Sequence, residues 1–258
     1  MGSTYVRLPV LFVAWRESES RIFRVVGRLV AVPARNGGFQ FEFAYTQGAA
    51  IASNTGFQGL PWLDHPLDFD RITSGEVPPR FFMEGRESDA PLAVLDDLAL
   101  GACHPTDESF EIFGAPYEQG PTADGDTCYL LNFYIHGLRY LDKKQAGCAE
   151  QLAKGDSLVV SHEPVVEDPD ALAIRTTEGT RVGYLPRYLA PDTRLIEHDD
   201  SALQVRVLEN LGSHLSPNRR IRCQLRACWP SGFRPFDLPT FQPVGNAIRL
   251  YGHNAVLA

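Results

Sequence analysis

The chain has 258 residues, of which 44% are hydrophobic, and its formal net charge is -8 at pH 7. That length and hydrophobic content allow one large domain or two small ones with real cores, and they exclude a disordered tail. The negative charge excludes a protein that coats nucleic acid without specificity, because such proteins gain their affinity by neutralising phosphates. A localised site is still allowed, since residues 1–128 carry 9 Lys and Arg against 18 Asp and Glu, whereas residues 129–258 carry 15 against 14.

The sequence gives no sign of a membrane segment. No apolar run approaches the roughly 20 residues that a membrane helix needs. The first residues also lack the basic-then-apolar order of a signal peptide. We therefore expect a cytoplasmic protein without a membrane partner.

The first half of the chain predicts a β-rich domain. Apolar and alternating runs favour strands at residues 5–15, 22–32, 39–45 and 109–113. Leucines near helical spacing, with Pro91 in the first turn and Gly101 just beyond the end, predict a short helix at 91–100. Residues 46–80 are rich in Gly, Pro, Asp and Ser, so we expect a long irregular connection there.

The second half predicts a small barrel. We expect strands at residues 128–136, 157–161, 171–176, 180–184, 202–208 and 219–229, and helices at 143–153 and 188–198. Glu178-Gly179 fits a tight hairpin turn between two of these strands. Five or six short strands with one or two helices in about a hundred residues are typical of a small closed sheet.

These elements together predict an α+β fold that is mainly antiparallel β. We expect an N-terminal β-rich domain with a short helix at residues 1–115, a linker rich in Pro, Gly and Asp at 116–127, a small domain at 128–236 and a C-terminal extension at 237–258.

No catalytic, metal or cofactor motif is found in the sequence. A P-loop, a Gly-x-Ser-x-Gly turn, a paired-histidine metal motif and a nucleotide-binding Gly-rich turn are all missing, so we expect neither an enzyme nor a cofactor. Asp96-Asp97 falls on the exposed face of the predicted helix, which favours a solvated pair over a metal site. Five cysteines without a repeated close spacing make a disulfide framework or zinc ribbon improbable. Cys223 and Cys228 should lie on opposite faces of one strand.

Candidate binding residues gather at the strand ends of the second half. A single-strand nucleic-acid site needs aromatic surfaces for bases and fixed positive charge for phosphates. Arg139 and Tyr140 leave the first strand together, Tyr184 ends a hairpin strand, and Arg187 follows the rigid Pro186. The closely spaced Arg219, Arg220, Arg222 and Arg226 predict a further row of guanidinium groups on one face of a strand, suited to phosphate.

Three blocks in this half carry a family resemblance: Gly137-Leu138-Arg139-Tyr140, then Asp168-Pro169-Asp170-Ala171-Leu172-Ala173-Ile174, then the run Val182 to Ala190. Their order and spacing resemble the HIRAN domain. The resemblance implies a six-stranded barrel of oligonucleotide-binding type that captures the end of a single DNA strand. It also implies that Arg139 and Tyr140 grip the terminal nucleotide and that Asp170 bonds the terminal sugar hydroxyl.

One block departs from the family pattern. Family members commonly show Asn-Pro-Tyr where this chain has Glu167-Asp168-Pro169, so acids replace an amide and a stacking ring. Simpler interpretations of the site also stay open. Arg139 and Arg187 are alternatively surface partners of Asp168 and Asp170. Tyr140 and Tyr184 alternatively pack inside the barrel, and the arginine row is alternatively a solvated strand face.

The front half, residues 5–88, is similar to the amino-terminal β-subdomain of HipA-type toxin kinases. The similarity lies in the order of its strands and in Asp70-Arg71 followed by Phe81-Phe82. No kinase core follows, so no kinase activity is carried over.

Three functions remain in competition. The first is a bacterial, non-catalytic DNA-binding protein that recognises a single-stranded 3′ end or an opened duplex in repair, restart or defence. Its front domain would contact a nuclease, helicase or toxin. The second is a regulatory or antitoxin-like interaction scaffold that has lost DNA binding because Glu167 and Asp168 repel phosphate. The third, an enzyme subunit acting on nucleic acid, would require a metal-dependent activity that no motif announces.

Overall fold

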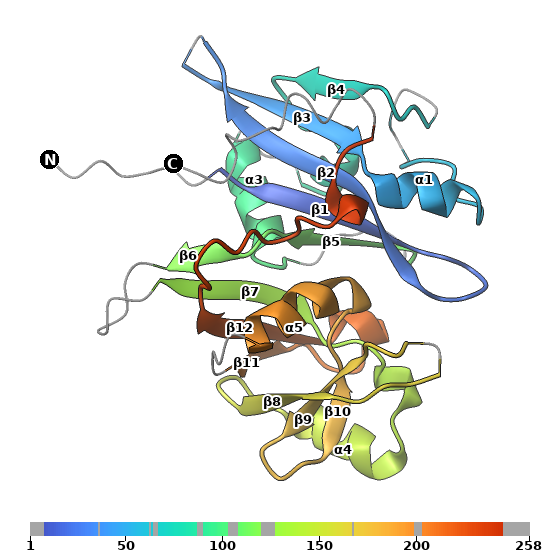
Figure 1. Ribbon diagram of the computed structural model, residues 1–258, viewed down its shortest axis with the longest axis vertical. Helices are drawn as coiled ribbons and strands as arrows, with labels where there is room; N and C mark the ends of the chain where they lie inside the picture. The colour runs from blue at the N-terminus through green and yellow to red at the C-terminus, as the bar shows by residue number, and fades with distance from the viewer. Residues whose placement is uncertain are drawn as a thin grey trace, which may run out of the picture. The chain divides into compact units, whose positions relative to one another are not determined.

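The computed structural model describes residues 8–35, 37–61, 63, 67–86, 90–102, 108–119, 127–166, 168–198 and 203–244. The chain divides into two compact units, one formed by Met1–Ala115 with Phe236–Ala258 and the other by Pro116–Pro235 (Figure 1). Every strand pairing within them is antiparallel, with a few short helices, which confirms the predicted α+β class. Among the described residues, no helix is long and apolar enough to cross a membrane.

The first unit contains a five-stranded sheet in the order β4-β3-β2-β1-β5. Its strands are β1 (Val10–Arg16), β2 (Phe23–Pro33), β3 (Phe39–Tyr45), β4 (Ile72–Gly75) and β5 (Phe110–Gly114). Its helices are α1 (Gln47–Ser53), α2 (Arg80–Met83) and α3 (Pro91–Ala99).

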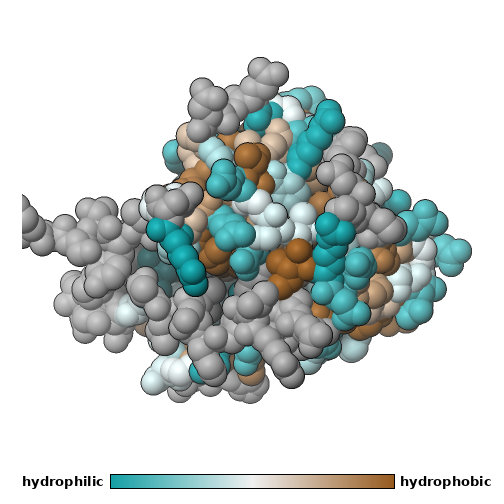
Figure 2. Space-filling view, turned by 90° about the horizontal axis from the view of Figure 1, so that it is seen from above, coloured by the Kyte–Doolittle hydropathy of each residue, from teal (hydrophilic) through white to brown (hydrophobic). Residues whose placement is uncertain are grey.

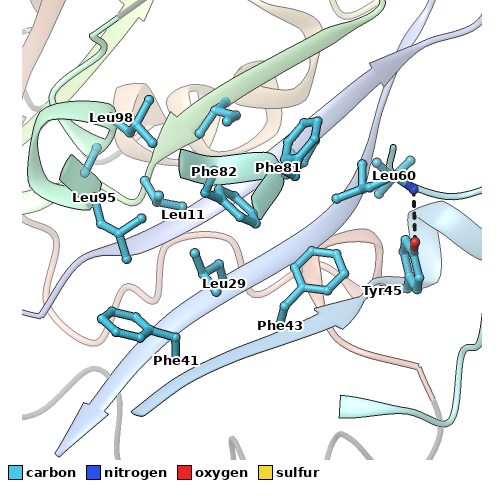
Figure 3. Close-up of a cluster of buried hydrophobic side chains, with 14 of the residues drawn as sticks. Leu11, Leu29, Phe41, Phe43, Tyr45, Leu60, Phe81, Phe82, Leu95 and Leu98 are labelled. Carbon is cyan, nitrogen blue, oxygen red and sulfur yellow. Dashed lines mark hydrogen bonds between the residues drawn. The ribbon is translucent and has the colours of Figure 1, made fainter. Parts of the chain in front are cut away.

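One face of this sheet packs against the three helices and forms the core. Phe41, Phe43 and Tyr45 alternate along β3 and point into it, as the period of two predicts (Figure 3). The N–H of Leu60 donates to the buried Tyr45 hydroxyl at 3.0 Å, so the polar end of this side chain is satisfied (Figure 3). The strands, helices and the segment at Leu60 therefore share one aromatic core.

A C-terminal segment packs onto the first unit. Phe236 stacks on Phe241 at 4.7 Å between ring centroids, and both rings make edge contacts with Phe12 of β1. The short 3-10 helix η4 (Pro239–Phe241) lies in this segment, and the N–H of Val244 donates to the carbonyl of Tyr45 at 3.1 Å. Instead of a separate extension, residues 236–244 belong to the first unit and pack on the sheet face opposite to the helices.

The second unit contains a seven-stranded sheet in the order β10-β9-β8-β11-β12-β7-β6. The strands are β6 (Tyr117–Gln119), β7 (Cys128–Tyr134), β8 (Ser157–His162), β9 (Leu172–Thr176), β10 (Arg181–Tyr184), β11 (Gln204–Asn210) and β12 (Ile221–Cys228). Beyond the end of β7, His136 and Tyr184 exchange two backbone hydrogen bonds of 2.9 Å each. This bridge joins the β7 end to β10, so six strands close on themselves and β6 extends the sheet.

Two helices and three 3-10 turns connect these strands. Helix α4 (Lys143–Gln151) begins at a capping box: the Asp142 carboxylate accepts from the N–H of Gln145, and the Gln145 side chain accepts from the N–H of Asp142. Helix α5 (Ala190–His198) follows β10. The 3-10 turns are η1 (Leu138–Tyr140), η2 (Arg187–Leu189) and η3 (Pro217–Arg219).

Two expected stretches differ from the structure. The connection at 46–80 contains α1 and β4, and the linker expected at 116–127 begins with β6, which pairs with β7. Helix α1 has only two turns, too few to show a clear helical period, and β4 and β6 have four and three residues, whose backbones find partners only in the folded sheet.

The cysteines and the exposed apolar side chains of the described residues are spread over separate parts of the fold. Cys223 is buried and Cys228 exposed, which confirms their opposite faces on β12, while Cys103 lies outside the described residues. Exposed large apolar residues such as Val77 and Leu195 belong to separate elements. In the space-filling view, hydrophobic residues likewise form small groups separated by hydrophilic ones (Figure 2).

Candidate nucleic-acid interface

Two glycines shape the point where the barrel closes. Gly137 has a φ of +75° and starts η1, and a Cβ at this position would lie 2.8 Å from Cδ2 of Tyr184. Gly183 has a φ of +146°, and a Cβ there would lie 2.2 Å from Cγ2 of Ile135. Only glycine fits both positions without displacing a neighbour. The first and third sequence blocks therefore meet because each supplies a glycine to the closing bridge.

Arg139 and Tyr140 project from η1 into solvent. Both side chains are exposed, Tyr140 at 67%, and the Arg139 guanidinium carbon lies 5.9 Å from the centroid of the Tyr140 ring. Tyr140 is thus excluded from the barrel core. The turn offers an exposed aromatic face next to a fixed positive charge, which is the pair of features that a base and its phosphate require.

Tyr184 is half-buried beneath this turn. Its ring packs against Gly137, and its hydroxyl accepts a hydrogen bond from Nη1 of Arg181 at 2.7 Å and donates to Oε1 of Glu163 at 3.4 Å. Burial raises the pKa of the Tyr184 phenol, and the neighbouring Arg181 charge opposes that rise. The ring edge is accessible, but the hydroxyl already has protein partners.

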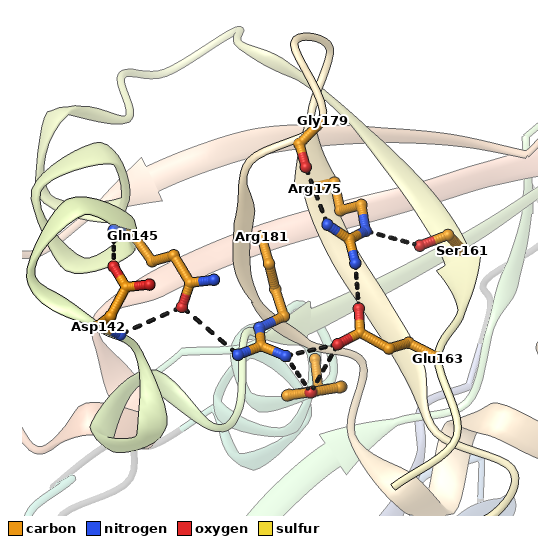
Figure 4. A network of polar contacts seen from close by, with 8 residues as sticks. Asp142, Gln145, Ser161, Glu163, Arg175, Gly179 and Arg181 are labelled. Atoms are coloured by element: carbon orange, nitrogen blue, oxygen red, sulfur yellow. Dashed lines mark hydrogen bonds and ion pairs between the residues drawn. The ribbon is translucent and has the colours of Figure 1, made fainter.

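Glu163 is the centre of the polar network around Tyr184. Its two carboxylate oxygens accept from Arg175 and from Arg181, and Arg175 also donates to the Ser161 hydroxyl at 3.1 Å (Figure 4). Nη2 of Arg181 lies 3.4 Å from the Gln145 side-chain oxygen, so the network reaches the first turn of α4 (Figure 4). One carboxylate therefore holds two guanidinium groups beside the candidate site.

The acids of the central block are paired with arginines. Asp168 lies 3.5 Å from Nε of Arg187, as one of the simpler interpretations predicts. The partner of Asp170 is Arg194 of α5, rather than Arg139. Glu167 lies outside the described residues. One arginine thus offsets Asp168, which departs from the family pattern, and another pairs with Asp170, which matches the family aspartate.

The arginines around β12 have separate roles. Nε of Arg220 donates to the carbonyl of Leu215 at 2.7 Å, and Arg222 pairs with Glu209 at 3.1 Å. Arg226 is exposed further along the strand. Turn η3, which precedes the strand, lies beside η1. Only the start of this row is therefore next to Arg139 and Tyr140.

Sequence reasoning missed Glu163, Arg175, Arg181 and Arg194. A signal was present for two of them, because the predicted hairpin at Glu178-Gly179 places Arg175 directly opposite Arg181. Like charges in directly opposed positions of an antiparallel pair are destabilising, so such a pair calls for an anion. The contact of Arg194 with Asp170 depends on how α5 packs and had no counterpart in the sequence.

Within the described parts of the chain, no three His, Cys, Asp or Glu side chains are grouped so that they could hold a metal ion. What the arrangement can do chemically is bind: it combines an exposed aromatic ring, several guanidinium groups and a carboxylate able to accept from a hydroxyl.

Comparison with known proteins assigns the second unit to a family. Residues 128–225 match the family model of the HIRAN domain. A protein from Lactobacillus plantarum, solved by a structural genomics consortium, is similar at 19% identity and a TM-score of 0.34, over 40% of this chain and 97% of that one. The HIRAN domain of human HLTF is similar at 16% identity and a TM-score of 0.29, over 44% of this chain and 77% of that one. No curated protein matches the chain.

The family match covers the second unit only. It begins at residue 128 and leaves the first unit without a family. The similarity of the front half to HipA-type kinases therefore stays a prediction.

Proposed function

We propose, from the premise that residues 128–225 form a HIRAN domain and hence a DNA-binding domain, that the second unit captures the end of a single DNA strand. The observation that carries this proposal is the exposed pair of Arg139 and Tyr140, on a turn that starts where Gly137 packs against the Tyr184 ring. A terminal base would stack on Tyr140, and Arg139 would bind the adjoining phosphate.

Asp170 supplies the preference for a free 3′ hydroxyl in this proposal. A carboxylate repels phosphate, but it accepts a hydrogen bond from a hydroxyl. Asp168 is an acid that argues against DNA binding, and its pairing with Arg187 offsets that charge. Tyr184, Arg187 and the nearby Arg220 would complete the pocket, whereas Arg222 is engaged by Glu209.

The biological role of the whole chain is inferred from this DNA-binding second unit. We infer a non-catalytic, cytoplasmic protein of bacterial DNA repair, restart or defence, whose first unit contacts a nuclease, helicase or toxin. The support is the DNA-binding family of the second unit together with the acidic composition of the first half.

An interaction scaffold without DNA affinity is the second candidate. One observation favours it: the Asp170 carboxylate already has a partner within the chain, Arg194, so it does not need a hydroxyl from a ligand. This candidate predicts a stable complex with another protein and no binding of oligonucleotides.

Binding of a labelled 12-nucleotide strand tests the proposal. We expect the wild type to prefer a free 3′ hydroxyl over a 3′ phosphate. We expect Arg139→Ala to remove the affinity for the strand. We expect Asp170→Asn to remove the preference for the free hydroxyl. Arg80→Ala removes the same charge from an exposed position of α2 and should leave binding unchanged. Absence of wild-type binding at low salt would overturn the proposal in favour of the scaffold.

A further inference from the structure

We propose that a strand captured at η1 continues across a basic strip formed by Lys143, Lys144, Arg181 and Arg175, which binds the phosphates behind the terminal nucleotide. This inference rests on the proposed function, because it gives the captured strand its path. It concerns residues outside the three sequence blocks that carry the family resemblance.

The strip starts immediately behind the terminal pocket. Turn η1 ends at Tyr140, and three residues later the exposed Lys143 and Lys144 open α4. The Asp142 carboxylate between them and η1 accepts from the N–H of Gln145 at 2.9 Å, so it serves as the helix cap. The lysines therefore lie next to Arg139 along the chain and face solvent at a helix N-terminus, where backbone N–H groups also favour anions.

Two contacts join the first turn of α4 to the two arginines. The Gln145 side chain, one residue after Lys144, lies 3.4 Å from Nη2 of Arg181 (Figure 4). Arg181 stands directly opposite Arg175 in the β9–β10 hairpin. The side chains of Arg175 and Arg181 are 32% and 21% exposed, so both can reach a ligand. Four cations thus follow one another from the first turn of α4 to the hairpin.

Charge along the strip exceeds what its acids can neutralise. Glu163 offers one carboxylate to two directly opposed guanidinium groups, and the Asp142 carboxylate caps α4 beside the two lysines. Four cations against these two carboxylates leave a net charge of +2, on a chain whose formal net charge is -8. Opposed like charges are stabilised by a further anion, and a phosphate is the anion that a DNA strand supplies.

The strip also has an end. Arg175 donates to the carbonyl of Gly179 at 2.9 Å, and Glu178 occupies the tip of the same hairpin, where its carboxylate accepts from the Thr177 hydroxyl. An acid at the tip repels the next phosphate. We therefore expect the strip to serve only the few nucleotides next to the captured end.

Oligonucleotide length separates the strip from the terminal pocket. We would measure Kd for 3-nucleotide and 12-nucleotide strands with free 3′ hydroxyls, using wild type, the double variant Lys143→Ala/Lys144→Ala and the control Lys154→Ala. Lys154 is exposed beyond the C-terminal end of α4. Loss of two phosphate contacts should weaken 12-nucleotide binding roughly tenfold and flatten its salt dependence, while 3-nucleotide binding and Lys154→Ala stay unchanged.

Each other outcome has a defined meaning. An unchanged 12-nucleotide Kd in the double variant, or an equal loss for both lengths, would overturn the strip while leaving end capture in place. Absence of wild-type binding to either length would overturn the proposed function and the strip with it. Lys143 and Lys144 are exposed, so thermal unfolding should show the double variant folded like wild type.

Discussion

The two compact units complete their sheets in different ways. The first unit keeps an open sheet, edged by β4 and β5, whose core face is covered by helices while Phe236 and Phe241 of a distant segment pack on Phe12. In the second unit, two backbone hydrogen bonds between His136 and Tyr184 join the end of β7 to β10. Gly137 and Gly183 lie next to these two residues and leave room for the close approach. Side-chain packing closes one unit, and backbone geometry closes the other.

This difference explains where charged side chains can gather. In the first unit the closing residues are aromatic and buried, so they offer no ligand contacts. In the second unit closure brings strand ends and turns together, and these carry Arg139, Arg181 and Glu163. Residues that a scaffold holds at the ends of strands, rather than in its core, are the ones available for binding.

The largest expected effect is on the first unit, from Phe236→Ala. The Phe236 side chain is 2% exposed and contacts Phe12, Phe113 and Phe241. Removing a buried phenyl ring should lower the free energy of unfolding of this unit by about 3–5 kcal/mol. Hydrogen exchange measured by mass spectrometry should show faster exchange in β1 and β5.

Leu238→Ala provides the matched control for that variant. Leu238 lies two residues further along the same segment but is 40% exposed, so we expect a change within about 0.5 kcal/mol. Equal acceleration of exchange in β7 to β12 on Phe236→Ala would break the comparison, since it would mean that both units unfold together.

The next effect is on barrel closure, from Gly183→Ala. The added methyl would meet Ile135 at 2.2 Å and the carbonyl oxygen of His136 at 2.6 Å, at a φ that L residues rarely adopt. Overpacking and backbone strain together should cost about 2–4 kcal/mol. Gly147→Ala is the control: its position in α4 has open space, so alanine should stabilise by about 0.5–1 kcal/mol. Denaturant unfolding of the second unit measures both, and a neutral Gly183→Ala would contradict the closure argument.

Much of this fold could be predicted from the sequence. The strand at 39–45 was predicted at its observed bounds, and the helices at 91–100 and 143–153 within two residues. These segments carry their own signals, in strict alternation or in a proline and a glycine at the two ends. The bridge between His136 and Tyr184 and the return of residues 236–244 to the first unit left no such signal, because they join segments that are far apart in the chain.

The candidate site divides in the same way. The sequence indicated Arg139, Tyr140 and Tyr184, and the structure brings them together through Gly137. The sequence did not indicate that Asp170 meets Arg194, since that contact depends on the packing of α5. A strand pattern places a residue on a face, but only the tertiary fold decides which opposite charge it meets.

The smallest expected effects on stability come from two groups of ion pairs in the second unit, one around Glu163 and one between Asp168 and Arg187. Glu163 is 27% exposed and holds two guanidinium groups, so Glu163→Gln should cost about 1–2 kcal/mol of stability. Asp168 meets Arg187 at 3.5 Å, and that arginine side chain is 43% exposed, so Asp168→Asn should change stability by less than about 0.5 kcal/mol. Urea unfolding of both variants measures the contrast, and equal losses would remove it.

The same two variants should also differ in DNA affinity, because each removes a negative charge from beside different arginines. Asp168→Asn removes a negative charge from beside Arg187 and keeps an oxygen for the backbone N–H of Asp170, so the pocket becomes more positive without losing its shape. Glu163→Gln frees Arg175 and Arg181 together, but both then lose the group that fixes their positions. We therefore expect Asp168→Asn to raise the affinity for a 3-nucleotide strand, and Glu163→Gln to raise only the salt-dependent affinity for a 12-nucleotide strand. Unchanged affinities in both variants would show that these arginines serve the fold alone.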